Sequence, residues 1–256
     1  MSVSSSLPPE IAQLAAQQQL GTFIAEYRPR LSNRSVLGCG IMLVGGVVLF
    51  FVVQSQPDAP FWGAYLAFGF CALVGLAIVG SFLINLRLRV YVWASGFIRA
   101  KGHQLYVRRW DHISSIRQNI TRHYTNGVYT GTTHVYTLLA TDGTSVTFRE
   151  PLGDIDHLGT TLVREITRVQ LPKAIAAYNA GERLQFGGIT VSKEGIGNGK
   201  ETLPWSQVKD IQVNKGYVSV KKEGKWLNWS SAPVAAIPNF FVFLPLVKAI
   251  REQQRQ

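Results

Sequence analysis

The stretch Trp110-Asp111-His112-Ile113-Ser114-Ser115-Ile116 is repeated, with substitutions, as Trp205-Ser206-Gln207-Val208-Lys209-Asp210-Ile211. Both copies follow the pattern W-x-x-[IV]-x-x-I, and both come after a glycine and an apolar residue, Gly96-Phe97 and Gly195-Ile196. In each copy, alternating apolar residues and turn signals then predict a β-hairpin, and apolar residues at helical spacing predict a helix after it. Because the same order of features occurs twice, the sequence predicts two related units.

In the first predicted unit, residues 87–180, a turn at Asp142-Gly143 determines which side chains line the core. The dipeptide suits a two-residue type I′ turn between two strands. That turn pairs Leu139 with Val146, and side chains alternate between the two faces of a strand. The predicted core face consists of Val135, Leu139, Val146 and Phe148.

In the second predicted unit, residues 181–256, the last three strands are expected over 211–213, 217–221 and 225–229. This assignment places Trp226 in an alternating strand, where burial in the core is expected rather than stacking on a nucleic-acid base. The sequence therefore gives no reason to expect a nucleic-acid partner.

Apolar residues at helical spacing predict several helices outside the strands. The N-terminal segment, residues 1–35, contains a short amphipathic helix over 9–20 that begins at two prolines. Asp154 is a good N-cap for a long helix, and Pro172 is expected to begin a separate short helix after it. The second unit is expected to end with a helix over about 240–253.

Residues 36–86 carry a single charged side chain, Asp58. Two apolar runs, over about 36–53 and 61–84, are each long enough for a membrane-spanning helix, which takes about 20 residues. Basic residues flank only the outer ends of this predicted transmembrane helical hairpin, so by the positive-inside rule both termini are expected in the cytoplasm. The expected location is therefore the plasma (inner) membrane, as an integral multi-pass protein.

The chain has 26 Lys and Arg against 15 Asp and Glu, for a formal net charge of +11. The whole excess of positive charge lies in residues 87–256. Basic side chains close to an anionic leaflet gain about 1 kcal/mol each, so the two units are expected to contact lipid headgroups. The candidate headgroup contacts are Arg99, Lys101, Arg108, Arg109, Lys221, Lys222 and Lys225. The alternative interpretation is that these charges serve only solubility and topology.

Several motifs of the second unit resemble a known family. They are Gly181-Glu182-Arg183-Leu184-Gln185-Phe186-Gly187, Gly195-Ile196, Leu203-Pro204-Trp205, Gly216, Gly224-Lys225, Trp229 and Ile237-Pro238-Asn239. Over nearly its whole length the chain resembles an uncharacterised family of bacterial two-span membrane proteins, a domain of unknown function. The resemblance implies an α+β fold in which a transmembrane helical hairpin precedes two small pleckstrin-homology-like β-barrel or sheet units, each closed by a C-terminal helix. The family has no assigned activity, so the resemblance implies none.

The sequence contains no motif typical of an enzyme. A nucleotide-binding loop, a G-x-S-x-G nucleophile elbow, an H-E-x-x-H zinc motif and kinase motifs are all missing. The five histidines and two cysteines show no spacing typical of metal ligands. We therefore expect no catalytic residue, no cofactor and no metal ion.

The expected function is that of a non-enzymatic, membrane-anchored scaffold. It would present its two units in the cytoplasm to anionic lipid headgroups, to a protein partner or to another copy of the chain. The alternative is an accessory subunit of an envelope or transport complex, in which the hairpin supplies the interface. An unrelated membrane anchor could replace the hairpin of a scaffold but not that of such a subunit.

Overall fold

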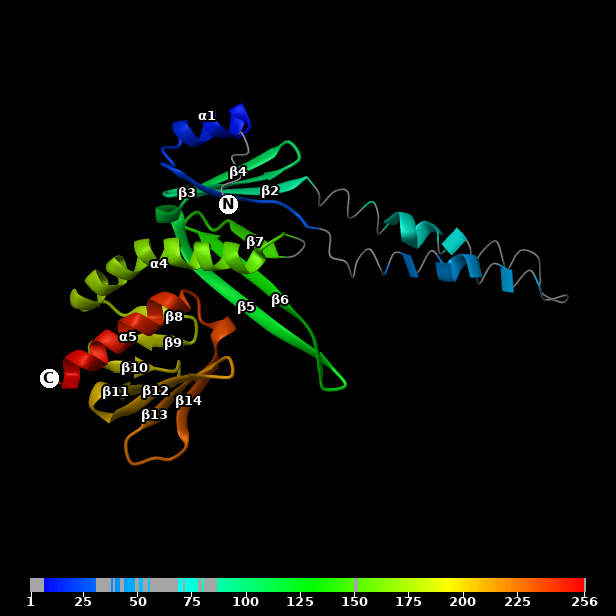
Figure 1. Ribbon diagram of the computed structural model, residues 1–256. Coiled ribbons are helices and arrows are strands. Elements are labelled where there is room, and N and C mark those ends of the chain that lie inside the picture. Colours follow the sequence, from blue (N-terminus) through cyan, green and yellow to red (C-terminus); the bar gives the residue numbers. More distant parts are fainter. Residues whose placement is uncertain are drawn as a thin grey trace.

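The computed structural model describes residues 7–30, 87–149 and 152–255, together with short stretches between residues 30 and 87 (Figure 1). These stretches are 38, 40–41, 44–48, 51–52, 55, 69–70, 72–77 and 80. The described part is mainly β-structure, in two four-stranded and two three-stranded sheets. A long helix, α4 (Ile155–Asn179), lies beside both units, and α5 (Phe240–Arg255) is the C-terminal helix (Figure 1).

The first unit contains a four-stranded sheet in the order β1-β2-β3-β4 and a three-stranded sheet in the order β5-β6-β7. Its elements are β1 (Phe23–Tyr27), β2 (Leu88–Trp93), β3 (Gly96–Lys101), β4 (Gln104–Arg109), the 3-10 helix η1 (Trp110–His112), β5 (Ile113–Thr125), β6 (Val128–Ala140) and β7 (Ser145–Arg149). All neighbouring strands are antiparallel. The first half of α4 completes the core of this unit.

The second unit repeats this order, and all its strands except the last are shorter than their counterparts. Its sheets are β11-β10-β9-β8 and β12-β13-β14. The elements are β8 (Leu184–Phe186), β9 (Ile189–Val191), β10 (Gly195–Gly197), β11 (Thr202–Pro204), η2 (Trp205–Gln207), β12 (Val208–Asn214), β13 (Tyr217–Lys222), β14 (Asn228–Pro233), η3 (Val234–Ala236) and α5. A separate hydrophobic core lies between these sheets and α5.

The repeated tryptophans have the same role in both units. Trp110 begins η1, is 1% exposed, and donates its indole hydrogen bond to the Trp93 carbonyl (3.2 Å). Trp205 begins η2, is 7% exposed, and donates to the Ser192 carbonyl (2.8 Å). A buried indole needs such an acceptor for its N–H. The W-x-x-[IV] pattern thus marks the point in each unit where the chain leaves one sheet and enters the next.

The repeated glycines allow close approach of neighbouring strands. A Cβ on Gly96 would meet the Arg108 carbonyl of β4, and a Cβ on Gly195 would meet the Leu203 carbonyl of β11. Neither position leaves room for a side chain without moving backbone. Glycine is therefore required at both positions for the same steric reason.

The predicted fold class is wrong. The expectation was an α+β chain with a transmembrane hairpin and two pleckstrin-homology-like barrels, whereas the described residues form mainly β-structure in four sheets and end in a helix. Within the described residues no strand ladder joins the two sheets of a unit, so neither unit is a closed barrel there. The class was implied by a resemblance that rests on short local motifs, and such motifs do not determine how sheets close.

The predicted transmembrane hairpin over about 36–53 and 61–84 is also corrected. In the part of the chain that the structure describes, no helix is both long enough and apolar enough to cross a membrane. The longest helical stretches described within the two runs are 44–48 and 72–77, and much of both runs lies outside the described residues. A span requires a continuous helix of about 20 residues, which apolar composition alone does not establish. The predicted location as an integral multi-pass membrane protein rested on the same two runs, so it is wrong for the same reason.

The core face of the first unit is shifted by one residue from the predicted one. The turn between β6 and β7 is longer than a two-residue turn, because the Ala140 amide donates to the Thr144 carbonyl (2.8 Å). Leu138, not Leu139, therefore lies opposite Val146, and Leu139 is 41% exposed. A slip of one residue turns every side chain of a strand to the other face. The buried residues of the two strands are Tyr136, Leu138, Ala140, Val146 and Phe148, whereas Val135 and Leu139 lie outside the buried core.

The N-terminal segment is part of the first unit. β1 pairs with β2, with Tyr27 opposite Val90, although residues 28–87 separate the two strands in sequence. The N-terminal helix α1 (Pro9–Gln17) lies on the outer face of the same sheet, where Ile11 packs near Trp93. The sequence predicts the helix but not β1, because the partner strand of β1 is so distant in the chain.

α4 is one continuous helix that contributes to both cores. Leu158 and Ile166 pack in the first core, and Tyr178 packs in the second. Pro172 lies inside the helix, so the predicted break at this residue is wrong; packing on both sides of it outweighs the loss of one amide donor. Asp154 precedes the helix with a left-handed backbone (φ 52°) and makes no side-chain capping bond, so the predicted N-cap interaction is not found.

Asn239 ties the second unit to the edge of β5. Its backbone N–H donates to the Ile116 carbonyl (2.8 Å), and its side-chain Oδ1 accepts from the Ile116 backbone N–H (2.9 Å). Its side-chain Nδ2 donates to the Ser114 carbonyl (2.8 Å). The backbone of Asn239 is left-handed (φ 53°), a conformation that asparagine adopts more easily than most residues. One residue thus continues the edge of a sheet that belongs to the other unit.

Candidate functional site

The candidate site is the connection between β13 and β14 in the second unit. β13 ends at Lys222, and β14 begins only at Asn228. The turn is held by the Lys225 amide, which donates to the Lys222 carbonyl (3.2 Å), and by the Glu223 amide, which donates to a carbonyl of η2 (2.8 Å). We call residues 221–227 the basic aromatic loop. It lies at the end of the second unit that points away from the first (Figure 1).

The loop exposes two large apolar side chains. Trp226 is 90% exposed and Leu227 is 67% exposed. Trp229, on β14, is by contrast half-buried and donates its indole hydrogen bond to Glu201 Oε1 (2.7 Å). The prediction that Trp226 is buried in a strand is wrong, because the strand starts three residues later than predicted. Covering one Trp side chain is worth on the order of 4 kcal/mol, so the exposed pair offers a large gain to any apolar or interfacial environment that accepts it.

Three of the predicted headgroup contacts lie in this loop. They are Lys221, Lys222 and Lys225. None of them forms an ion pair with a residue that the structure describes. Asp210, which lies opposite Lys221 in the sheet, accepts hydrogen bonds from Gln212 (2.7 Å) and Arg251 (3.0 Å) instead. Burial opposes ionisation of Asp210, but these hydrogen bonds hold its pKa below the ordinary value.

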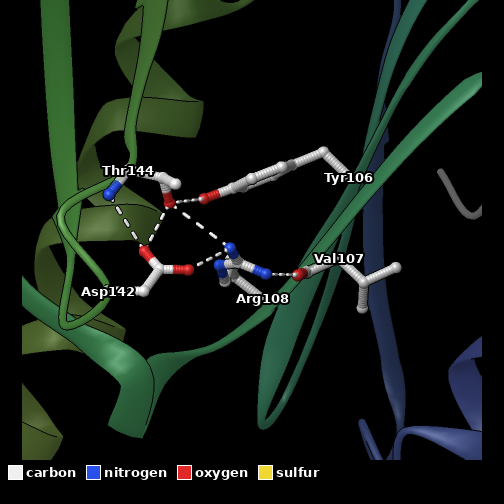
Figure 2. Close-up of polar contacts among 5 residues, drawn as sticks. All are labelled: Tyr106, Val107, Arg108, Asp142 and Thr144. Carbon is white, nitrogen blue, oxygen red and sulfur yellow. Dashed lines mark hydrogen bonds and ion pairs between the residues drawn. The ribbon is translucent and has the colours of Figure 1, made fainter.

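Arg108, a predicted contact in the first unit, holds β4 to the turn between β6 and β7 (Figure 2). Its Nη2 lies 2.5 Å from Asp142 Oδ2 and 3.3 Å from Thr144 Oγ1, and its guanidinium lies 4.5 Å from the centre of the Tyr106 ring. Hydrogen bonds from the Thr144 hydroxyl and amide, together with the charge of Arg108, hold the pKa of Asp142 below its ordinary value. Arg108 is therefore engaged within the protein.

Arg109 is engaged as well. Its Nε donates to Asp111 Oδ1 (3.2 Å), and its Nη1 donates to the carbonyls of Gln18 (3.4 Å) and Gln19 (3.3 Å). These two carbonyls follow α1, so Arg109 fixes the end of the N-terminal helix against the sheet. Its role is structural.

The remaining two predicted contacts lie on β3. Lys101 is exposed beside the turn to β4, and Arg99 is half-buried on the same strand. The structure thus brings the three lysines of the second unit together in one loop. In the first unit Arg99, Lys101 and Arg108 lie on one face of the sheet, and Arg109 lies on the other. The sequence predicts the lysines of the basic aromatic loop as contacts but not the exposure of Trp226 and Leu227 beside them. The sequence signal for this exposure is that Trp226 comes directly after Lys225, which itself follows the turn residues Glu223-Gly224.

The arrangement of the described residues suits binding of a ligand better than chemistry on one. Within residues 7–30, 87–149, 152–255 and the short stretches, no three His, Cys, Asp or Glu side chains are grouped closely enough to hold a metal ion. The basic aromatic loop combines ammonium groups that form no ion pair with a described residue and exposed apolar side chains. That combination suits a partner that is negatively charged and also accepts an indole ring.

Comparison with known proteins places the chain in a family. Neither the curated proteins nor the solved structures give a match to it. A family model described as a family of unknown function, DUF6585, matches residues 1–256. The expectation of an uncharacterised family is thereby confirmed, while the membrane and pleckstrin-homology-like parts of that resemblance have no support. Because the match covers the whole sequence, the chain belongs to DUF6585, a family of unknown function.

Proposed function

We propose that the protein is a non-enzymatic binding protein that attaches reversibly to anionic phospholipid headgroups through the basic aromatic loop. The observation that carries this proposal is the exposure of Trp226 and Leu227 beside lysines that have no ion-pair partner among the described residues. In this proposal β13, β14 and η2 form the frame that holds the loop in place.

Electrostatics supports an anionic surface as the partner. Each lysine within reach of an anionic leaflet contributes about 1 kcal/mol. The loop has three lysines and one acid, Glu223, and Asp210 opposite Lys221 is bonded to Gln212 and Arg251. Salt screens the attraction between lysines and headgroups beyond the Debye length, which is about 8 Å at physiological ionic strength. Binding is therefore expected to weaken as salt is raised.

The apolar pair supports a lipid surface rather than a purely polar anion. An indole ring has an apolar body and one N–H donor, and tryptophan is favoured at the interface between headgroups and hydrocarbon. Exposed neighbouring apolar side chains rimmed by polar groups typically mark interaction sites. The loop lies at the end of the second unit that points away from the first unit, so the first unit does not stand between the loop and a surface that approaches from that end (Figure 1).

Vesicle co-sedimentation of the full-length chain tests the proposal. We expect binding to vesicles of phosphatidylcholine mixed with phosphatidylserine and little binding to phosphatidylcholine alone. The double substitution K222Q/K225Q removes about 2 kcal/mol and should weaken binding about 30-fold. W226A/L227A should weaken it at least 10-fold, on the order of 1.4 kcal/mol or more.

A matched control is available at the tip of the β5–β6 hairpin. Tyr124 and Val128 are 60% and 67% exposed there, so Y124A/V128A removes an exposed aromatic and an exposed aliphatic side chain from a turn that lacks lysine. This variant should bind like the wild type. Equal binding to neutral and anionic vesicles, or unchanged binding of both loop variants, would overturn the proposal.

A further inference from the structure

Arg99 lies at the boundary between the core of the first unit and solvent. In the register of the sheet it lies between Val90 of β2 and Tyr106 of β4, and Val90 is fully buried. Phe97, two residues earlier on the same face of β3, packs in the core. The stem of Arg99 therefore runs along the inner face of the sheet, and the side chain is half-buried.

The guanidinium of Arg99 has no anionic partner among the residues that the structure describes. Its Nε is buried without a hydrogen-bond acceptor, and it forms no ion pair there. Desolvation by burial lowers the pKa of Arg99 from its ordinary value, with a smaller opposing effect from Tyr106. A partly desolvated charge without a partner is unfavourable, so this side chain is better suited to a bound anion than to the free protein.

The other arginines of the same sheet show that the missing partner is a local feature. Arg89 Nη1 lies 3.2 Å from Glu26 Oε1, and Arg108 Nη2 lies 2.5 Å from Asp142 Oδ2. Arg109 Nε lies 3.2 Å from Asp111 Oδ1. In each case a neighbouring element supplies a carboxylate. The Tyr106 hydroxyl beside Arg99 is already paired with Thr144 Oγ1 (3.1 Å) across the gap between the sheets (Figure 2).

A second cation stands on the same face of β3. Lys101 is two residues from Arg99, about 7 Å along the strand, and it is exposed beside a tight turn that contains Gly102 (φ 61°). An Arg fork can bind two oxygens of one anion, and a Lys adds a mobile point charge. A phosphate group carries about −1.5 to −2 charges at neutral pH and has three or more acceptor oxygens, which matches two cations better than a carboxylate does.

We infer that Arg99 and Lys101 form a phosphate-binding site on the first unit, separate from the basic aromatic loop. The phosphate belongs either to a small soluble compound or to a lipid headgroup. This inference does not depend on the proposed function, because the two sites lie on different units and share no residue.

Thermal unfolding of the full-length chain in phosphate-free buffer, with and without inorganic phosphate at matched ionic strength, tests the site. Saturating phosphate should raise the Tm of the wild type by about 2–4 °C. Arg99→Met keeps the apolar stem but removes the charge, so its Tm without phosphate should equal or exceed that of the wild type, and phosphate should have no effect on it. Lys101→Gln should respond more weakly than the wild type. Arg117→Met, at an exposed position on β5, is the control and should respond fully.

A second arm separates the two sources of phosphate. The K222Q/K225Q variant, which lacks two charges of the basic aromatic loop, is mixed with vesicles that contain phosphatidic acid, with and without Arg99→Met. A response to inorganic phosphate assigns the site to a soluble compound, and an Arg99-dependent response to these vesicles alone assigns it to a headgroup. The inference is overturned if neither ligand acts, if Arg99→Met responds like the wild type, or if Arg99→Met is less stable than the wild type without phosphate.

Discussion

The two units share a frame and differ in what they do with positive charge. In each, a glycine lets two strands approach, a tryptophan begins the 3-10 helix between the sheets, and a helix closes the core. In the first unit Arg108 and Arg109 make contacts between elements, whereas the lysines of the basic aromatic loop form no ion pair with a described residue, and Lys225 is exposed. The shared glycine, tryptophan and helix thus determine where each hairpin begins. The residues at the hairpin tips differ between the units.

Hairpin length shows the same freedom. β5 and β6 have 13 residues each, whereas the corresponding β12 and β13 have 7 and 6. The extra length in the first unit runs beyond β7, which pairs with β6 only from Val135 to Leu139. The first unit therefore has a long projecting hairpin, visible in Figure 1, where the second unit has a short one.

The largest effect should come from removing the shared tryptophans. Trp110→Ala and Trp205→Ala each leave a large cavity and an unpaired carbonyl, so each should lower the free energy of unfolding by about 3–5 kcal/mol in urea titrations. Trp226→Ala is the control of the same residue type and should change it by less than about 0.5 kcal/mol, because the side chain is exposed. A small effect at either buried tryptophan would break the equivalence of the two units.

A smaller effect is expected where the units meet. Asn239→Ala leaves the Ile116 amide without its acceptor and should cost about 2 kcal/mol in the free energy of unfolding. Asn239→Asp keeps the acceptor but turns the donor toward the Ser114 carbonyl into a second oxygen, so it should cost at least as much at neutral pH. Asn228→Asp, at an exposed position, is the matched control. If Asn239→Ala is as stable as the wild type, the link between Asn239 and β5 contributes nothing.

The smallest effect is electrostatic. Glu26 contacts Arg28 (2.7 Å) and Arg89 (3.2 Å), and although burial opposes its ionisation, these partners hold its pKa below the ordinary value of 4.5. The stabilisation is therefore complete above pH 4.5 and is lost as pH falls through the lower pKa of the folded state. Glu26→Gln should lower the Tm above this range and flatten its fall in acid, by an amount equivalent to less than about 1 kcal/mol because both arginines are well exposed.

The pH dependence of Tm also tests a carboxylate of the second unit. Asp210→Asn in the second unit should flatten the acid limb in the same way, because the pKa of Asp210 is also held low. Glu194→Gln, which removes a carboxylate that forms no ion pair with a described residue, should leave the pH dependence unchanged. An unchanged acid limb in Glu26→Gln would mean that its ion pairs do not stabilise the folded protein.

Local signals predicted the parts of the fold that depend on neighbouring residues. The tryptophan and glycine repeats were found in sequence because one residue type at each position meets a local steric or hydrogen-bonding need. The register of β7 was missed because the Asp142-Gly143 turn closes at Thr144, and one additional residue changes the buried face. β1 was missed because its pairing depends on a strand far away in sequence.

The candidate site was predicted in part. Charge counting identified Lys221, Lys222 and Lys225, but alternation of apolar residues misplaced Trp226, since a loop and a strand can both alternate over a few residues. The same counting could not separate Arg108, which is paired, from Arg99, which has no ion-pair partner among the described residues, because partners from other elements decide the difference. Hydropathy misled the assignment of residues 36–86, where apolar composition was equated with membrane-spanning helices.

The pairing of β1 with β2 determines how the protein can be divided for experiments. A fragment that begins at residue 87 lacks the edge strand beside β2 and the helix that covers Tyr91 and Trp93, so it would present an open sheet edge and a bare apolar face, both of which promote aggregation. Since Tyr27 and Leu88 end and begin adjacent antiparallel strands, a short turn can join them directly. Those two residues are the junction at which the intervening residues can be removed while the sheet stays whole.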